Sequence, residues 1–245
     1  MNMEEREYHS LRAAEDRHWW FVSTQKHVVR CVRSATRRTP LQVLDAGCGT
    51  GGLASRLRRL GTVRCIDASP IAVEYTRARG LEHVNCSELM TAELEDNSLD
   101  AITSVDVLYH AGVKDPQAVA TRLGRALRPG GVLVLHLPAF EIFRGPHDQR
   151  VHTRKRFRRS EVRELLANAG LDVRHVSYRV TALLPLILVW RWVQRKSPTS
   201  DIRTPVAPIN RLLLWIADIE NRISTVLPLP FGLSVYAIAR KADER

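Results

Sequence analysis

The sequence has few lysines and few cysteines, and its apolar runs are short. Five of the 37 basic residues are lysine, and the four cysteines form no C-x-x-C pair. The longest apolar stretch, residues 181–193, falls short of the roughly 20 residues that a membrane-spanning helix needs. The acidic start, with no apolar segment behind it, also argues against a secretory signal. These absences predict a reducing compartment, so we expect a cytoplasmic protein, with contact at the inner membrane face left open.

The chain of 245 residues is strongly basic, with a formal net charge of +11. Heavy arginine use fits a GC-rich genome as well as it fits a physical demand. No Lys/Arg block is interleaved with aromatic residues, and no nucleic-acid-binding motif is present. We therefore expect no nucleic-acid partner. A basic protein still favours acidic partners, such as phosphate-bearing substrates or an anionic membrane surface.

Apolar runs and helical patterns alternate along most of the chain. Residues 1–37 are predicted to form an N-terminal helical extension, with an aromatic cluster at 18–21 and Ser23 as the cap of a second helix. Ser69, followed by Pro70, and Ser160 are predicted to cap two later helices. The expected strands are residues 41–45, 63–67, 83–86, 101–105, 132–137, 171–178 and 233–239. This alternation predicts an α/β domain over 38–245, with a seven-stranded, mostly parallel sheet and helices on both faces. A helical insertion, 180–230, precedes the last strand.

Ligands of such sheets bind beyond the carboxyl ends of the strands. Gly47, Gly49 and Gly51 follow the first strand and open a helix, whose N-terminus favours a ligand carboxylate. The spacing also fits a dinucleotide fingerprint, which leaves NAD as an alternative. Asp45 argues against NAD, because a carboxylate repels a pyrophosphate and attracts an ammonium group. Asp67, at the end of the second strand, can accept hydrogen bonds from both hydroxyls of a ribose.

Four segments of this sequence resemble motifs of the class I S-adenosylmethionine (SAM)-dependent methyltransferases: residues 43–51, 66–69, 99–110 and 127–131. The resemblance covers about residues 40–178 and the last strand, and it implies a Rossmann-like class I methyltransferase fold with SAM as the cofactor. The implied cofactor contacts are Asp45, Gly47, Cys48, Gly49, Gly51, Asp67, Ala68, Met90, Asp106 and Val107. Segment 87–96 departs from the usual adenine-contacting pattern, so Met90 and Thr91 are both candidates there. Residues 18–21 and 138–152 also resemble a bacterial group that methylates small molecules.

The acceptor site is expected just past the fourth and fifth strands. A general base is needed there if the acceptor is a hydroxyl, a protonated amine or a carbon acid. His147, Asp148 and His152 permit three interpretations: a histidine base oriented by Asp148, a metal-binding triad, or a loop held by hydrogen bonds. We expect no resident metal. Tyr109, which stands where an acidic residue is more common, is a further catalytic candidate, whereas His136 is predicted to be a core histidine.

The insertion is apolar and helical. Residues 208–227 place seven apolar side chains on one helical face: Ile209, Leu212, Leu213, Ile216, Ile219, Ile223 and Val226. It is interpreted as a cap that packs on the aromatic cluster, as a peripheral membrane contact or as a homodimer interface. Each interpretation predicts an apolar pocket.

The expected function is methylation of a small, hydrophobic or lipid-linked biosynthetic intermediate, most simply at oxygen. The alternatives are methylation at nitrogen or carbon, with or without a metal, and a SAM-binding scaffold at a membrane that turns nothing over. A nicotinamide-dependent oxidoreductase is a third alternative.

Overall fold

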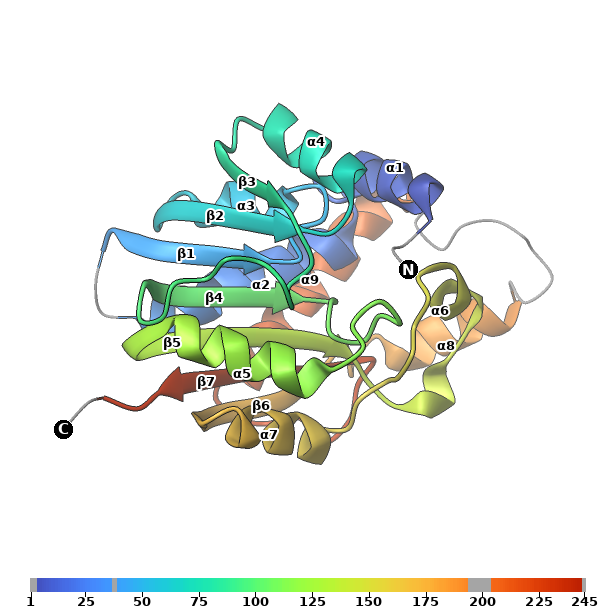
Figure 1. The fold of residues 1–245 in the computed structure, drawn as a ribbon. Helices are drawn as coiled ribbons and strands as arrows, with labels where there is room; N and C mark the ends of the chain where they lie inside the picture. Colours follow the sequence, from blue (N-terminus) through green and yellow to red (C-terminus); the bar gives the residue numbers. More distant parts are fainter. Residues whose placement is uncertain (1–3, 37–38, 194–203, 244–245) are drawn as a thin grey trace.

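A computed structural model describes residues 4–36, 39–193 and 204–243, with the backbone alone at 146–147 and 190–193 (Figure 1). Its seven strands form one sheet in the order β3-β2-β1-β4-β5-β7-β6. The first five strands run parallel, and β7 runs antiparallel to both β5 and β6. The strands are β1 Leu41–Ala46, β2 Gly61–Asp67, β3 His83–Cys86, β4 Leu99–Val105, β5 Leu127–Pro138, β6 Leu171–Arg179 and β7 Ser234–Lys241. The predicted sheet is therefore confirmed.

Helices cover both faces of this sheet (Figure 1). On one face lie α2 (Trp19–Ala35), α3 (Gly52–Leu57) and α9 (Ala207–Ser224). The other face is covered by α5 (Pro116–Ala126) and α7 (Arg159–Asn168). The remaining helices are α1 Glu5–Ala14, α4 Pro70–Ala78, the short η1 Glu141–Phe143, α6 Pro146–Arg150 and α8 Leu184–Val193. Within the described ranges, no helix is long and apolar enough to cross a membrane.

Helix caps explain several boundaries. Ser69 accepts a hydrogen bond from the Ala72 amide at the start of α4, as the Ser-Pro pair predicts. Asp115 does the same for the Ala118 amide at the start of α5. These polar residues satisfy amide groups that have no partner inside their helices, which fixes where each helix begins.

Two predicted caps are wrong. The second helix begins at Trp19, before Ser23, and the His18 ring nitrogen accepts from the Trp20 amide. Ser23 instead lies buried inside the helix. Similarly, α7 begins at Arg159, with Arg158 rather than Ser160 at its cap position. In both helices the start lies one or more residues upstream of the nearest Ser, because other residues supply the capping contact.

Helices α8 and α9 pack on the N-terminal aromatic cluster, in agreement with the cap interpretation of the insertion. A small core joins them: Trp19, Val180, Leu183, Leu184, Ala217 and Leu233. The orientation of α9 is unexpected. Its packed face carries polar side chains, including Asn210, Glu220 and Asn221, whereas much of its predicted apolar face is exposed to solvent.

Candidate cofactor and acceptor site

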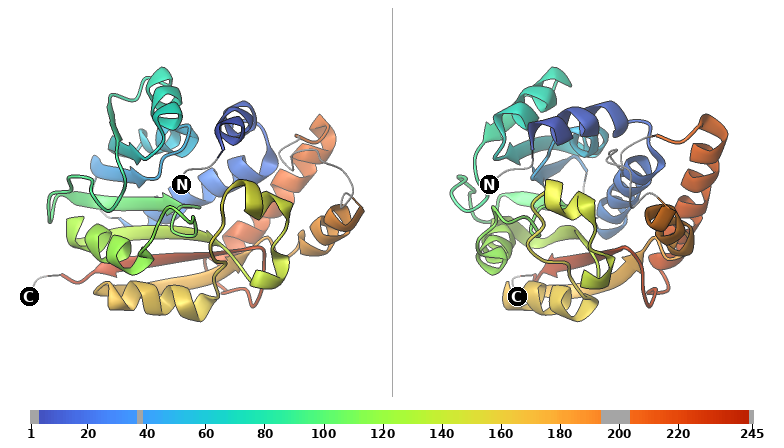
Figure 2. Two further views of the ribbon diagram at one scale, coloured as in Figure 1. Left: turned by 45° about the vertical axis from the view of Figure 1, so that its right-hand side comes forward. Right: turned by 90° about the vertical axis from the view of Figure 1, so that its right-hand side faces the viewer.

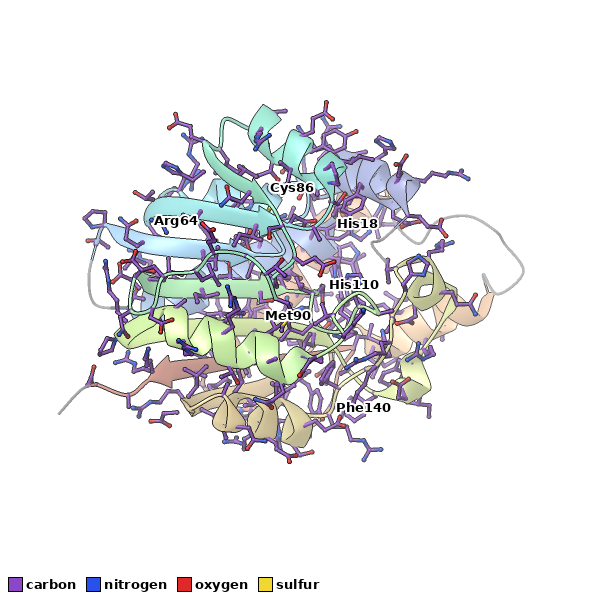
Figure 3. All side chains as sticks on the ribbon, viewed as in Figure 1. His18, Arg64, Cys86, Met90, His110 and Phe140 are labelled. Carbon is purple, nitrogen blue, oxygen red and sulfur yellow. The ribbon has the colours of Figure 1, made fainter. Side chains whose placement is uncertain are left out.

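A cavity of about 960 Å³ lies at the carboxyl ends of the parallel strands. Its floor comes from β1, β2, β4 and β5, and helices α1, α2, α8 and α9 contribute its walls. His18, Met90 and His110, which Figure 3 labels, all line it. This volume is at the upper end of the range for small-molecule sites, so the cavity has room for a cofactor and an acceptor together.

The glycine loop approaches the cavity closely. Gly47 has a φ of +83°, and a Cβ atom there would lie 2.2 Å from a methyl carbon of Val107. Only glycine fits such a position. Gly47, Cys48 and Gly49 line the cavity, whereas Gly51 lies outside the lining. Gly51 also has a left-handed backbone (φ +82°), so its glycine serves the turn into α3.

Asp45 is a buried carboxylate with an unused oxygen. Its side chain is 1% exposed, and Oδ1 accepts a hydrogen bond of 2.8 Å from the Thr103 hydroxyl. Oδ2 has no hydrogen-bond partner. Burial raises the pKa of Asp45 to about 7. An orphaned carboxylate oxygen beside a cavity suits a cationic ligand group such as an ammonium.

Asp67 is held in place by backbone amides. Its two oxygens accept from the Gly49 amide at 2.8 Å and from the Ser69 amide at 2.9 Å. Each oxygen keeps a second lone pair, so the carboxylate can still accept from two hydroxyl groups. Burial raises the pKa of Asp67 despite these bonds. The predicted ribose-binding geometry is therefore available.

At the N-terminus of α3, the carboxylate of Glu15 accepts from one backbone amide, and binding of a ligand carboxylate there stays a prediction. The Gly52 amide donates to Glu15 at 3.0 Å, and the Thr50 hydroxyl also donates to this carboxylate. Arg79 completes the cluster with a 2.6 Å contact to Glu15. This cluster ties the N-terminal extension to the glycine loop, next to the cofactor half of the cavity.

A chain of buried polar groups ends at Asp106, directly after β4. Asp106 has a left-handed backbone (φ 55°), and its Oδ1 lies 3.1 Å from Nδ1 of His136. The other ring nitrogen of His136 lies 2.9 Å from Arg179. A guanidinium group can only donate, so His136 accepts at Nε2 and donates from Nδ1 to Asp106. His136 is fully buried with both nitrogens bonded, which confirms it as a satisfied core histidine.

Asp106 is consequently an ionised group facing the cavity. Burial alone would raise its pKa, but His136 and, more weakly, Arg179 hold it below its ordinary value. The side chain is 35% exposed and belongs to the cavity lining. Within the described residues, Oδ2 makes no hydrogen bond, so it can accept one from a ligand.

Tyr109 also lines the cavity. Its ring stacks on His110 with 4.2 Å between centroids, and Nδ1 of His110 lies 2.6 Å from the Val151 carbonyl. Burial, reinforced by Asp106 and Asp148, raises the pKa of Tyr109 well above its usual value. Tyr109 is thus a neutral phenol that can donate a hydrogen bond rather than act as a base.

In the loop after β5, Asp148 lines the cavity, but its hydrogen bonds stay within the loop. Asp148 is buried, and its oxygens accept from Arg156 at 3.1 Å and from the Gly145 amide at 2.8 Å. These bonds hold the loop. His152 is not part of the cavity lining, and the side chain of His147 lies outside the described residues. Across the described part of the chain, no group of three His, Cys, Asp or Glu side chains could hold a metal ion.

Other polar side chains, such as Glu7, Gln25 and Glu88, also line the cavity, but one region of the lining is mostly apolar. The N-terminal aromatic cluster and the insertion supply most of this region: Trp19, Trp20, Phe21, Leu186, Ile187, Ile209, Leu213 and Leu233. The polar cofactor half and the apolar half meet near Asp106 and Tyr109. Such a division favours an apolar acceptor beside a polar cofactor.

Sequence comparisons agree with this site. Residues 44–135 match the family model described as a methyltransferase domain. This segment is similar to the class I SAM-dependent methyltransferase family. It is 36% identical over 149 residues to a ubiquinone biosynthesis O-methyltransferase of Xanthomonas oryzae pv. oryzae. That alignment covers 55% of this chain and 61% of the relative, so the match spans about three fifths of the curated relative.

Solved structures share the methyltransferase fold over most of the chain. A methyltransferase in complex with the Haloferax volcanii Trm112 methyltransferase activator is 21% identical, with a TM-score of 0.66 over 100% of this chain and 99% of that one. The cyclase SpnF is 20% identical, with a TM-score of 0.58 over 89% and 80% of the two chains. These identities show the fold alone, and one fold can host different chemistries.

Sequence reasoning missed two features of this site. Glu15 carried no motif, although it holds the glycine loop. Arg179 lay in the last residue of a strand, and only the fold shows that it supports His136 and Asp106. A long-range contact leaves no local pattern. The available signal for Arg179 was a charge between Tyr178 and Val180, at the end of a predicted strand.

Proposed function

We propose that this protein transfers a methyl group from SAM to a hydroxyl group of a small, hydrophobic or lipid-linked biosynthetic intermediate. The proposal rests on one observation: two carboxylates with different roles line the same cavity. Asp45 has a buried, unpartnered oxygen, and Asp106 is held ionised where the apolar half begins. The relative named as a ubiquinone biosynthesis O-methyltransferase supports oxygen as the acceptor atom.

The residues of the polar half fit the cofactor. Asp45 would hold the ammonium group, and Asp67 would hold the two ribose hydroxyls. Gly47 and Gly49 allow close backbone approach, and Met90 lines the region expected for the adenine. When bound, SAM supplies a methyl group activated by a positively charged sulfur. The protein therefore has to place the acceptor and remove a proton.

Asp106 is the proposed proton acceptor. A hydroxyl becomes strongly acidic as its oxygen is alkylated, so a carboxylate with a low pKa can take its proton. His136 donates to Oδ1 of Asp106 and is itself held by Arg179, which keeps Asp106 ionised and aligned. Oδ2 of Asp106 is left for the acceptor. Tyr109 would donate a hydrogen bond to the acceptor and help to orient it.

Calorimetric titration with SAM and with NADH tests the cofactor. Wild type should bind SAM in the micromolar range and should not bind NADH, and Asp67→Ala should weaken SAM binding at least tenfold. If the protein bound NADH and did not bind SAM, a hydride-transfer function would be indicated instead.

Turnover is tested by the release of S-adenosylhomocysteine with 4-alkylphenols, 1-alkanols and alkylamines as probes. We expect methylation of the hydroxyl probes. Asp106→Asn should lower kcat about 100-fold or more with unchanged SAM affinity, whereas the exposed Asp96→Asn should match wild type. Transfer to amines alone would favour N-methylation. SAM binding without any turnover would favour a scaffold.

A further inference from the structure

Helix α9 presents an apolar stripe to solvent. We define the α9 stripe as Leu212, Trp215, Ile219 and Ile223, whose spacing of three and four residues places them on one helical face. Their exposed fractions are 54, 63, 39 and 48%. In the right-hand view of Figure 2, α9 forms an outer edge of the molecule with α8 beside it. A contiguous exposed apolar surface of this kind marks an interaction site.

Polar contacts fix the stripe in its outward orientation. On the opposite face of α9, Glu220 accepts from the amides of Val180 and Ala182, and Asn221 accepts from buried Arg179 at 2.7 Å. If the helix rolled to bury the stripe, these groups would lose their partners. Unpaired buried polar groups are costly, so the helix cannot hide its apolar face in this way.

Positive charge borders the stripe. Arg211 and Arg222 are exposed on α9 and lie one helical turn from stripe residues. The two acids of this helix are engaged: Asp218 lies 3.3 Å from Arg30 and 3.7 Å from Arg222, and Glu220 points inward. Arg211 is therefore the stronger of the two bordering charges. An apolar face with an exposed tryptophan and an arginine border matches the interface of a bilayer with anionic headgroups.

The stripe adjoins the apolar half of the cavity. Leu186 and Ile209 both line the cavity and are 56 and 52% exposed, so the cavity wall continues onto the outer surface. From this geometry we propose that the α9 stripe docks on an anionic lipid bilayer and that the apolar acceptor enters the cavity from the lipid. The route of entry rests on the proposed function, whereas the docking does not.

Co-sedimentation with vesicles tests the docking. One set contains equal amounts of phosphatidylglycerol and phosphatidylcholine, and the other contains phosphatidylcholine alone. Wild type should sediment with the anionic vesicles at low salt and far less with the neutral ones. Trp215→Glu with Ile219→Glu should leave the protein in the supernatant. Arg211→Glu with Arg222→Glu should lower partitioning at least tenfold, since each basic residue contributes about fivefold.

The matched control is Arg64→Glu with Arg163→Glu, which makes the same charge change on the opposite face of the sheet. It should stay within about threefold of wild type. Equal losses in the control and in the α9 variants would reduce the effect to net charge and overturn the proposal. Wild type that stays wholly in the supernatant would also overturn it.

Light scattering without lipid tests whether a second copy of this chain covers the α9 stripe instead. We expect a monomer. A dimer that Trp215→Glu dissociates would show that a second copy covers the stripe, which overturns lipid docking. Thermal melting and SAM titration of each variant report on folding and on the cofactor site. If the wild type bound vesicles but not SAM, the result would contradict the proposed function and would still support the lipid docking.

Discussion

The affinity for SAM should depend on pH through Asp45. In the free protein, burial raises the pKa of this carboxyl to about 7, while a bound ammonium requires the ionised form. Binding therefore releases a proton below pH 7, and affinity falls as the pH falls. With a pKa of about 7, roughly one tenth of the sites are ionised at pH 6. The Kd should then rise about fivefold between pH 7, where half of the sites are ionised, and pH 6, which corresponds to about 1 kcal/mol.

Calorimetric titration from pH 5.5 to 8 in two buffers of different ionisation enthalpy measures both the Kd and the released proton. Asp45→Asn should bind SAM about 10- to 100-fold more weakly at pH 8, because it loses a charge-assisted bond, and its Kd should be flat below pH 7. Methylthioadenosine lacks the ammonium group, so it should show no such slope with wild type. An equal slope with methylthioadenosine, or a flat profile for SAM, would refute the role of Asp45.

The same substitution separates binding from stability. The folded-state pKa of Asp45 lies above that of an unfolded chain, so ionising it destabilises the protein progressively from about pH 4 to pH 7. Asp45→Asn keeps an oxygen for the Thr103 hydroxyl and carries no charge. The variant without ligand should therefore melt several degrees higher than wild type at pH 8, and the difference should vanish near pH 4, as differential scanning calorimetry can measure.

Three further substitutions probe the frame of the site. Glu15→Ala removes the carboxylate that joins Arg79 to the glycine loop, and it should lower the unfolding free energy by about 2–4 kcal/mol in a denaturant titration. Gly47→Ala places a methyl group against Val107, so SAM binding should be lost in calorimetry while the helical circular dichroism signal persists. Leu123→Ala in the core beneath α5 should cost about 2–5 kcal/mol, and an unchanged melting temperature would contradict the packing described for that face.

Local patterns were sufficient for the sheet and for part of the site. Most strands contain a short apolar run. Asp45 and Asp67 stand near the ends of two strands, which a parallel sheet brings to one edge. The role of Glu15 could not be predicted, because its partners Thr50 and Gly52 are 35 and 37 residues away. The sequence left three interpretations of His147, Asp148 and His152 open. The bonds of Asp148 to Arg156 and the Gly145 amide fit the loop-holding interpretation, and the side chain of His147 lies outside the described residues.

The orientation of α9 shows a further limit of sequence patterns. Periodicity separates an apolar face from a polar face, but it does not reveal which face packs against the protein. The default expectation places the apolar face inward. Here the buried Arg179 needs acceptors beneath the sheet, and Asn221 on the polar face of α9 supplies one of them. That requirement decides the orientation of the helix.

One buried guanidinium thus connects the two proposals. Arg179 donates to Asn221 on α9 and to His136, and His136 in turn donates to Asp106 in the cavity. Burial lowers the pKa of Arg179 from its usual value, yet a guanidinium group remains charged at neutral pH. Its charge must be met by fixed acceptors, because water does not reach it. The contacts that keep Asp106 ionised in the cavity therefore also hold the polar face of α9 inward, which leaves its apolar stripe outside beside the cavity mouth.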